Sequence, residues 1–326
     1  MKINSVSLNV NTFLIDGCEP LSFDLYNSTV LINKSTDYDY KIQTNNLNLT
    51  NITELIKKIY FLSPDKLYKI IFNENECAVP NNTSYGIINL TTKTIEHPDF
   101  YKNKKIFSYS VYYANPKYTI GAIKNCEQYM EEYKNFMILF FVRNDVPEEI
   151  IKKIKEIGGT VIKTLFVPDW FMRFTRFLPS ESSQFLCSRD TDGRLILREK
   201  VVNEQFMNSN KKFHIIRDHP YHNTEILAGM WSIQNLNFDK IRFAMLDFGL
   251  KDDINPYGGM DHDQKFLTNY IWPHLNKELI MAHDNFFNYN NNKILINLPR
   301  SNREFIGEPY DADDNVEQKF RDLITD

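Results

Sequence analysis

Cysteine is scarce in this chain, and the positions of the few cysteines exclude two common kinds of site. Only four occur among 326 residues, at Cys18, Cys77, Cys126 and Cys187, far apart and without a C-x-x-C pair. That spacing fits neither a disulfide framework nor a zinc knuckle. We therefore expect free thiols and a reducing compartment.

Long apolar runs are also missing. No stretch approaches the roughly 18 consecutive apolar residues that a membrane-spanning helix needs. The first residues, MKINSVSLNVNTF, lack the charged-then-apolar layout of a secretory signal. The sequence therefore predicts a cytoplasmic protein of the producing or host cell, neither secreted nor membrane-spanning.

A positive charge excess and a glycine-rich phosphate loop are absent as well. The formal net charge is -4, with no basic run of the kind that marks a nucleic-acid partner. Glycine contributes only 11 residues, and no G-x-G-x-x-G segment follows a predicted strand. These absences argue against nucleic-acid binding and against a dinucleotide-binding motif.

What the chain does contain is a strand–helix alternation that begins at Ile106. Apolar residues make up 42% of the sequence, enough for a substantial core. Alternation with short connections predicts right-handed crossovers and a mostly parallel sheet flanked by helices, an α/β Rossmann-type domain over residues 105–326. The predicted strands are Ile106–Tyr112, Phe136–Val142, Val161–Val167 and Phe213–Ile216, and the predicted helices are Ile120–Tyr133, Pro147 to Gly158-Gly159, Glu199–Asn208 and Phe266–Leu275.

Residues 1–104 have a different pattern. Short alternating runs separated by Asn-rich turns predict strands, and one helix is expected at Ile52–Phe61. We interpret this part as a smaller N-terminal α+β accessory module, for which homodimer formation or acceptor docking are the expected roles. The predicted strands are Ser5–Val10, Ser28–Ile32, Lys69–Phe72 and Gly86–Leu90.

A pair of carboxylates follows the fourth strand of the larger domain. Phe185-Leu186-Cys187 is typical of a buried strand, and the turn after it contains Asp190 and Asp192. Ligands of open α/β sheets bind beyond the carboxyl ends of such strands. Two carboxylates there can hold a divalent cation that keeps positions open for a diphosphate. The alternative is that both aspartates are simply solvated in a turn.

Arginines surround this pair. A phosphate-bearing ligand bound through a metal would use several of them, and we expect Arg173 and Arg189 at the donor. The alternative is ion pairing with Glu181, Glu199 and the aspartates, which we expect for at least two of the arginines. The set comprises Arg173, Arg176, Arg189, Arg194 and Arg198.

Histidines form a second group. His214, His219 and His222 lie close together, but their spacing fits no helix face and Pro220 interrupts it. A catalytic zinc site is one interpretation, and a polar pocket wall is the other. His283 leads a polar turn after a buried run, and we expect it to be a third metal ligand.

Asp261 and Asp263 supply carboxylates from another loop. An inverting displacement at a sugar carbon needs a base that takes the proton of the acceptor hydroxyl. Asp263 is the predicted base, because Gln264 and the apolar helix after it fix its position. It is equally suited to be the N-cap of that helix.

Taken in order, these segments resemble a known family. The motifs SRDTDGR, RE, HIIRDHPYH, ILAGMW, DQKFL, HDN and FIGEPYD together resemble the GT-A-type glycosyltransferases with a DxD motif. Members of that family occur in bacteria, large DNA viruses and eukaryotes. The similarity runs from about Phe107 to Tyr310 and does not cover residues 1–104.

The resemblance implies a nucleotide-sugar donor, UDP-linked, and a Mn²⁺ or Mg²⁺ ion on its diphosphate. Asp190 and Asp192 match the DxD motif, and His283 resembles the late histidine that completes some of these metal sites. The remaining matches are Asp263-Gln264 near the acceptor and sugar, Gly229-Met230 where the sugar approaches the backbone, and Tyr118 and Asp145 near the nucleoside.

The sequence thus leads to one main functional expectation and two rivals. The main one is a metal-dependent glycosyltransferase that moves a sugar to a hydroxyl of a glycan, protein or small-molecule acceptor. One rival is a metal-dependent phosphoester hydrolase that uses the same aspartates with His219 and His222. The other is a non-catalytic nucleotide- or sugar-binding module.

Overall fold

The structure, a computed structural model, covers the larger domain in most detail. It describes residues 100–164, 171–238, 262–289 and 293–324 with their side chains, isolated positions between 241 and 248, and the backbone of seven strands within residues 1–99. The predicted helix Ile52–Phe61 and the predicted strand Gly86–Leu90 lie outside the described residues, as do Cys18, Cys77 and Asp261.

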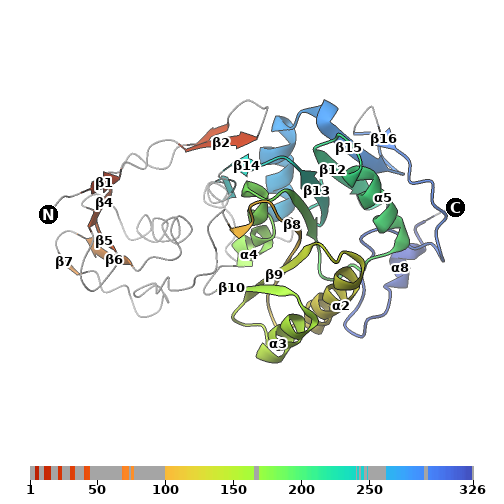
Figure 1. Ribbon diagram of the computed structural model, residues 1–326, viewed down its shortest axis with the longest axis horizontal. Coiled ribbons are helices and arrows are strands. Elements are labelled where there is room, and N and C mark those ends of the chain that lie inside the picture. Colours follow the sequence, from red (N-terminus) through yellow and green to blue (C-terminus); the bar gives the residue numbers. More distant parts are fainter. Residues whose placement is uncertain are drawn as a thin grey trace.

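An eight-stranded sheet forms the centre of the larger domain, in the order β10-β9-β8-β11-β13-β12-β15-β16 (Figure 1). All neighbouring strands are parallel except β13, which is antiparallel to both β11 and β12. The expected α/β fold with a mostly parallel sheet is therefore confirmed. The strands are β8 (Lys105–Val111), β9 (Met137–Arg143), β10 (Thr160–Thr164), β11 (Phe185–Arg189), β12 (Phe213–Arg217), β13 (Met230–Gln234), β15 (Ile280–Asp284) and β16 (Lys293–Ile294).

Three helices cover one face of this sheet: α2 (Pro116–Glu132), α3 (Glu148–Ile157) and α5 (Leu197–Met207). Helix α2 begins where the Asn115 side chain accepts the N–H of Lys117 at 3.0 Å and Pro116 occupies the first turn. Helix α3 ends at Gly158, whose φ of 110° suits a residue without a Cβ. Because side chains alternate along a strand, Phe140 contributes to this layer and Phe141 to the opposite one.

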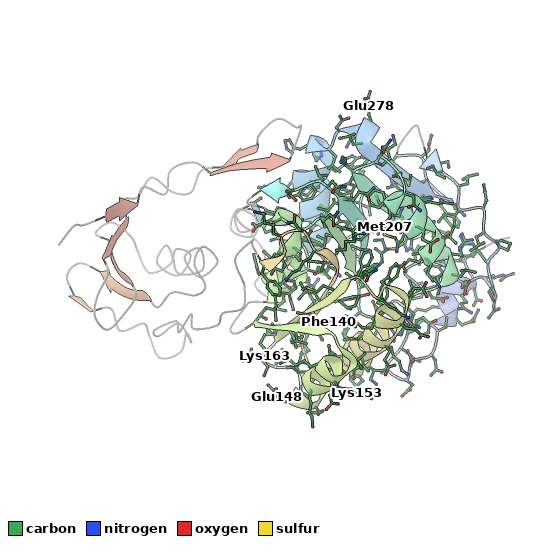
Figure 2. All side chains as sticks on the ribbon, viewed as in Figure 1. Phe140, Glu148, Lys153, Lys163, Met207 and Glu278 are labelled. Atoms are coloured by element: carbon green, nitrogen blue, oxygen red, sulfur yellow. The ribbon has the colours of Figure 1, made fainter. Side chains whose placement is uncertain are left out.

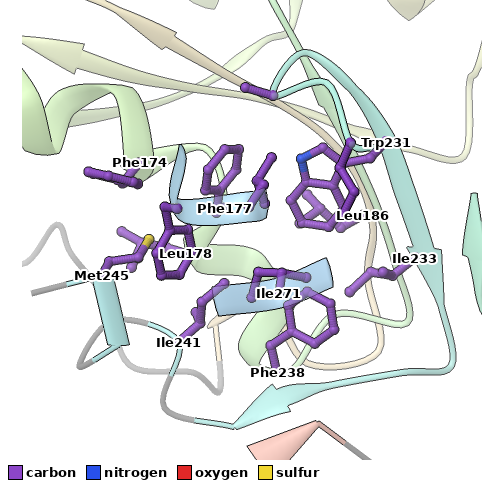
Figure 3. Close-up of a cluster of buried hydrophobic side chains, with 14 of the residues drawn as sticks. Phe174, Phe177, Leu178, Leu186, Trp231, Ile233, Phe238, Ile241, Met245 and Ile271 are labelled. Atoms are coloured by element: carbon purple, nitrogen blue, oxygen red, sulfur yellow. The ribbon is translucent and has the colours of Figure 1, made fainter. Parts of the chain in front are cut away.

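The opposite face is covered by shorter segments. Phe174 of α4 meets Phe266 of α7 at 5.4 Å between ring centroids, and Phe177 meets the fully buried Trp231 at 5.3 Å (Figure 3). Replacing one such buried aromatic side chain with alanine lowers the free energy of unfolding by about 3–5 kcal/mol. The segments are α4 (Asp169–Thr175), η2 (Leu178–Glu181), β14 (Phe238–Asp239), α7 (His262–Phe266), η3 (Leu267–Ile271) and η4 (Trp272–His274), and the exposed turn η5 (Lys277–Leu279) then leads into β15.

The N-terminal strands form two further sheets, one of five strands and one in which β14 of the larger domain joins β2 and β3. Phe238 pairs with Ile15 there. A strand pairing that the sequence did not predict therefore links the N-terminal strands to the larger domain. The strands are β1 (Asn4–Val6), β2 (Asn11–Ile15), β3 (Leu21–Phe23), β4 (Val30–Asn33), β5 (Tyr40–Thr44), β6 (Tyr68–Phe72) and β7 (Asn75–Glu76).

Charged side chains lie at the periphery of the described part, as Glu148, Lys153 and Glu278 show, whereas Phe140 lies inside (Figure 2). Of the helices that the structure describes, none combines the length and apolar character needed to cross a bilayer. The last short helix, α8 (Gln318–Arg321), is tied back to the domain by ion pairing between Arg321 and the buried Glu308.

Candidate functional site

Two neighbouring cavities open at the carboxyl ends of β8 and β11. Cavity 1 has a volume of about 360 Å³ and cavity 2 about 240 Å³. Both are lined by Arg176, Asp190 and Asp263, so these three side chains form the boundary between them. The position is the one expected for ligands of an open α/β sheet, beyond strand ends where chain segments diverge.

The acidic pair lies at this boundary. Asp190 and Asp192 directly follow β11, and both line cavity 2. Asp190 has a side chain that is 55% exposed and is ion-paired with Arg176, whereas Asp192 is 21% exposed and lies 3.2 Å from Lys117 Nζ. Each aspartate thus faces a cationic side chain at a cavity wall, although Asp190 is also more than half exposed to solvent.

Lys117 connects the acidic pair to the C-terminal segment. Its Nζ donates to Glu317 Oε1 at 2.7 Å and also reaches Asp192. The backbone N–H of Tyr310 donates to the Asp192 carbonyl at 2.9 Å. The C-terminal residues therefore help to fix the loop that carries the two aspartates.

The two carboxylates repel each other, although each already faces a cationic side chain. Burial raises the pKa of Asp192 above its ordinary value of 3.8, the negative charge of Asp190 raises it further, and Lys117 opposes both effects. A divalent ion between the two carboxylates would remove this repulsion. Across the described residues, no group of three or more histidine, cysteine, aspartate or glutamate side chains is placed to hold a metal. Any ion here would take its other ligands from substrate and water.

Arg176 organises the boundary. Its Nη1 reaches Asp190, and its Nη2 donates to Asp263 Oδ2 at 2.8 Å. Asp263 Oδ1 accepts the N–H of Gln264 at 3.0 Å. Burial raises the pKa of Asp263, although the positive charge of Arg176 opposes this. A carboxylate oxygen has two lone pairs, so Asp263 can still accept a proton or a further hydrogen bond.

Gly229 allows Asp190 to sit where it does. A Cβ added to Gly229 would lie 1.9 Å from Asp190 Oδ2, far inside van der Waals contact. Gly229 and Met230, the first residue of β13, both line cavity 1, and Met230 is 4% exposed. The space that a Cβ at Gly229 would need is thus occupied by the Asp190 carboxylate, and the expected approach of a sugar to this backbone stays a prediction.

The side-chain amide of Gln264 is hydrogen-bonded at both ends and holds a neighbouring loop in position. Its Oε1 accepts the N–H of Ala228 at 3.0 Å, and its Nε2 donates to Ile226 O and, at 3.2 Å, to Thr224 Oγ1. Both ends of the amide therefore hold the loop that carries Gly229. A direct catalytic role of Gln264 is not supported by this geometry.

His283 is not part of the acidic site. It lies in β15, which is separated from β11 by two intervening strands, so the two strands are roughly 14 Å apart at usual strand spacing. Its Nδ1 shares a hydrogen bond of 2.8 Å with His214, and its Nε2 one of 2.7 Å with Gln205. The expected third metal ligand is therefore wrong, because both ring nitrogens are used inside the core.

The other histidines do not form a zinc site. His219 Nδ1 accepts the N–H of Tyr221 at 3.0 Å, and His219 Nε2 is 2.9 Å from the Phe320 carbonyl. His222 Nδ1 accepts the N–H of Asp218 at 3.0 Å. A metal-bound imidazole keeps a proton on its other nitrogen, which these accepted N–H groups prevent. Of His214, His219 and His222, only His222 lines cavity 1 or cavity 2, so the pocket-wall interpretation fits that residue alone.

Of the residues expected to bind the donor near its nucleoside, some line cavity 2 and one does not. Tyr118, at 37% exposure, and Arg173 both line cavity 2, next to Tyr112. Asp145 lines neither cavity. It is ion-paired with Arg143, and although burial opposes the effect, that hydrogen bond and charge lower the pKa of Asp145. The structure therefore brings Tyr118 and Arg173 to the site and leaves Asp145 outside it.

Most of the clustered arginines are ion-paired, two of them (Arg176 and Arg189) with the partners that the alternative interpretation named and two (Arg194 and Arg198) with other aspartates. Arg189 Nε donates to Glu199 at 2.6 Å, Arg194 lies 2.7 Å from Asp314, and Arg198 lies 2.9 Å from Asp218. Arg189 lines cavity 1 but also donates to the Ser188 carbonyl at 3.0 Å. It therefore shapes the wall of cavity 1 instead of reaching cavity 2 beside the acidic pair.

Sequence reasoning missed several members of the site. Arg176 appeared only as one arginine among five, Lys117 only as part of a loop, and Glu199 only as an ion-pair partner. Glu199 lines cavity 1, where its Oε1 also accepts from Tyr129 at 2.7 Å. No local pattern singles these residues out, because segments far apart in the chain bring them together.

Comparisons with known proteins add little to this geometry. No family model matches the chain, and no curated protein matches it. Among solved structures, a mycobacterial protein aligns with 43% of this chain and 55% of its own, at 9% identity and a TM-score of 0.29. This chain thus spans about half the length of that protein, and so weak a similarity carries no argument about fold or function.

Proposed function

We propose that this chain is a metal-dependent glycosyltransferase that uses a nucleotide sugar as donor. The observation that supports it is the pair of cavities divided by Arg176, Asp190 and Asp263. A nucleotide sugar has two bulky parts joined by a diphosphate, and two adjoining cavities with a cation site at their boundary suit that shape. The resemblance of the ordered motifs to DxD glycosyltransferases points the same way.

In this proposal, Asp190 and Asp192 hold a Mn²⁺ or Mg²⁺ ion. A bound ion of this kind stabilises negative charge on a departing diphosphate by Lewis-acid and electrostatic effects. Arg176 and Lys117, already at the two carboxylates, add positive charge beside the same position. In the nucleoside half, Tyr118 presents a half-buried ring and Arg173 a guanidinium in cavity 2.

Asp263 is the proposed base of an inverting route. It borders cavity 1, its pKa is raised by burial, and Arg176 fixes its orientation at 2.8 Å. A raised pKa makes a carboxylate a better proton acceptor near neutral pH. In a retaining route the leaving phosphate would take the acceptor proton, and Asp263 would only orient Arg176.

A thermal-shift screen of nucleotide sugars, with Mn²⁺ and with chelator, tests this proposal. The correct donor at a hundred times its Kd should stabilise the folded state by about 2.7 kcal/mol, and only with the metal. Asp192→Asn should abolish this stabilisation. Glu149→Gln, at an exposed position in the first turn of α3, is the matched control that loses one carboxylate elsewhere.

Turnover separates the proposal from its rivals. A glycosyltransferase should transfer the sugar of the selected donor to an acceptor, detected by mass spectrometry of the product. A phosphoester hydrolase would release phosphate from simple phosphoesters without any sugar transfer. A binding module would show the metal-dependent stabilisation but no turnover. Donor binding that survives Asp192→Asn in the presence of Mn²⁺ would refute the metal role.

A further inference from the structure

His222 lines cavity 1, and the hydrogen bond to its Nδ1 decides which ring nitrogen carries the proton. The residue follows β12 in a polar loop and lines cavity 1, and its Nδ1 accepts the N–H of Asp218 at 3.0 Å. Because that lone pair is occupied, the neutral ring carries its proton on Nε2. Nε2 has no protein partner within the described residues, and it is not sealed from solvent as His214 Nδ1 is.

The surroundings keep this ring neutral and in place. The ring of Phe305 lies 5.9 Å from it and that of His219 5.6 Å, centroid to centroid. Burial lowers the pKa of His222 to about 3, and His219 and the positive charges of Arg217 and Arg300 contribute. Asp218, whose N–H donates to His222, has a carboxylate that accepts from Arg198 and Arg300. His222 therefore offers an N–H donor, and no charge, at ordinary pH.

The charged groups of cavity 1 balance one another. Its wall carries three arginines and three carboxylates, and the arginines already have anionic partners. Away from the boundary with cavity 2, an anionic group on the ligand would meet only Arg189 and Arg194, which are paired with Glu199 and Asp314, and it would lose its hydration without compensation. The ionised residues are Arg176, Arg189, Arg194, Asp190, Glu199 and Asp263.

We propose that cavity 1 binds an uncharged polyhydroxyl ring, a neutral hexose rather than a uronic or other acidic sugar, and that His222 donates from Nε2 to one of its hydroxyl oxygens. Hydroxyl groups can both donate to the carboxylates and accept from the arginines and His222. A volume of about 360 Å³ lies at the lower end of ordinary ligand sites. The inference rests on the proposed function for the link between this ring and a nucleotide.

Two substitutions separate binding from structure at this position. In His222→Asn the side-chain oxygen can replace Nδ1 as acceptor for the Asp218 N–H, but nothing reaches the position of Nε2. In His222→Gln the longer amide places an N–H donor near that position. His219→Asn is the control for general damage, because His219 lies in the same loop and lines neither cavity.

The first measurement follows the His222 ring by nitrogen NMR while neutral methyl hexosides are added. A saturable shift of the Nε2 signal is expected with at least one of them, and none with methyl glucuronide. The second measurement is calorimetry with Mn²⁺ and four probes: UDP, UDP-glucose, GDP-mannose and UDP-glucuronate. His222→Asn should weaken binding of the preferred neutral sugar nucleotide about tenfold, as the loss of one hydrogen bond allows. Binding of UDP itself should stay unchanged, and His222→Gln should restore most of the loss.

Three results would overturn the inference. One is a His222 signal that no neutral hexoside or sugar nucleotide shifts, and another is tighter binding of the glucuronate than of every neutral probe. The third is a His222→Asn variant that binds all probes as the unchanged protein or as His219→Asn does. The proposed function fails separately, when nucleoside diphosphates show no metal-dependent binding, since that depends on Asp190 and Asp192 and not on His222.

Discussion

Gly229 and Asp190 show how one residue without a side chain can define a site. The carboxylate of Asp190 occupies the space that a Cβ at Gly229 would need, with Oδ2 only 1.9 Å from it. The sequence led us to expect a sugar near this glycine. It did not reveal that the chain's own carboxylate approaches it, because Asp190 follows β11 and Gly229 precedes β13, two strands that are far apart in the sequence.

Gly229→Ala should therefore displace Asp190 while the fold survives. Inserting a methyl group at a tight contact costs about 1–3 kcal/mol of stability. The loss of Mn²⁺ affinity should exceed what that destabilisation explains, as measured by calorimetry on folded protein. Gly193→Ala is the control, since its Cβ would meet nothing closer than 3.8 Å. Equal Mn²⁺ affinity in both variants would contradict this assignment.

Lys117 competes with any cation for Asp192. The ammonium group lies 3.2 Å from Asp192 and is shared with Glu317. Lys117→Gln should raise the affinity for Mn²⁺ alone several-fold, because a partly buried ion pair of this kind is worth about 1 kcal/mol. It should also weaken diphosphate binding, since a positive charge is lost. Lys319→Gln, which removes the other lysine on Glu317, should change neither. Weaker Mn²⁺ binding in Lys117→Gln would count against this interpretation.

At the scale of elements, local patterns predicted most of the sheet but not its polar core. The runs that became β8, β9 and β11 are apolar and bounded by turn residues, so their signal is local. Strand β15 was mistaken for a buried run ending in a turn, because His283 and Asp284 are polar. Both are fully buried, and their partners, His214 and Arg217, come from β12. Such long-range pairing leaves no trace in the local sequence.

Helix α4 was missed for a similar reason. Its residues, DWFMRFT, carry no alternation of polar and apolar positions that would mark a surface helix. Tertiary packing of Phe171 and Phe174 against the sheet decides its conformation. Because α4 carries Arg173 and precedes Arg176, the missed helix also explains why the central role of Arg176 was not predicted.

The buried histidine pair between β12 and β15 should make the fold acid-sensitive. Burial lowers the pKa of His283 from its ordinary 6.5 to about 4, and burial also lowers that of His214. The unfolded chain thus binds protons at a higher pH than the folded chain. The free energy of unfolding is therefore highest above about pH 6.5. It falls as the pH drops toward 4, by about 3 kcal/mol for His283 alone.

Urea unfolding between pH 7 and pH 4.5 measures this effect. His283→Gln, which keeps hydrogen-bonding capacity but does not titrate, should show a shallower loss of unfolding free energy over that range. His274→Gln, at a residue outside the buried pair, should behave as the unchanged protein. Parallel pH curves for all three proteins would contradict the assignment.

At the scale of the whole molecule, the site belongs to the larger domain. The residues that line the two cavities fall between Ser110 and Gly307. An antiparallel strand pairing between β14 and β2 joins this domain to the N-terminal strands. The predicted division near residue 104 therefore separates the described site from the N-terminal module, apart from that pairing at the edge of the domain.

A fragment of residues 100–326 should accordingly bind nucleoside diphosphates and Mn²⁺ as the full chain does. We expect a Kd within about fivefold of the full-chain value, because a hydrogen bond lost at a distant edge is worth about 1 kcal/mol. Exposure of the β14 edge should lower its solubility. A folded fragment without binding would place part of the site in residues 1–99.

The central claim is that Asp190 and Asp192 jointly hold a divalent ion at the boundary of the two cavities. The most direct measurement is the anomalous scattering of manganese in crystals grown with Mn²⁺ and a nucleoside diphosphate. We expect one strong peak within coordination distance of both carboxylates, with the diphosphate beside it and the nucleoside in cavity 2. A structure with the nucleotide bound and no peak between Asp190 and Asp192 would contradict the claim.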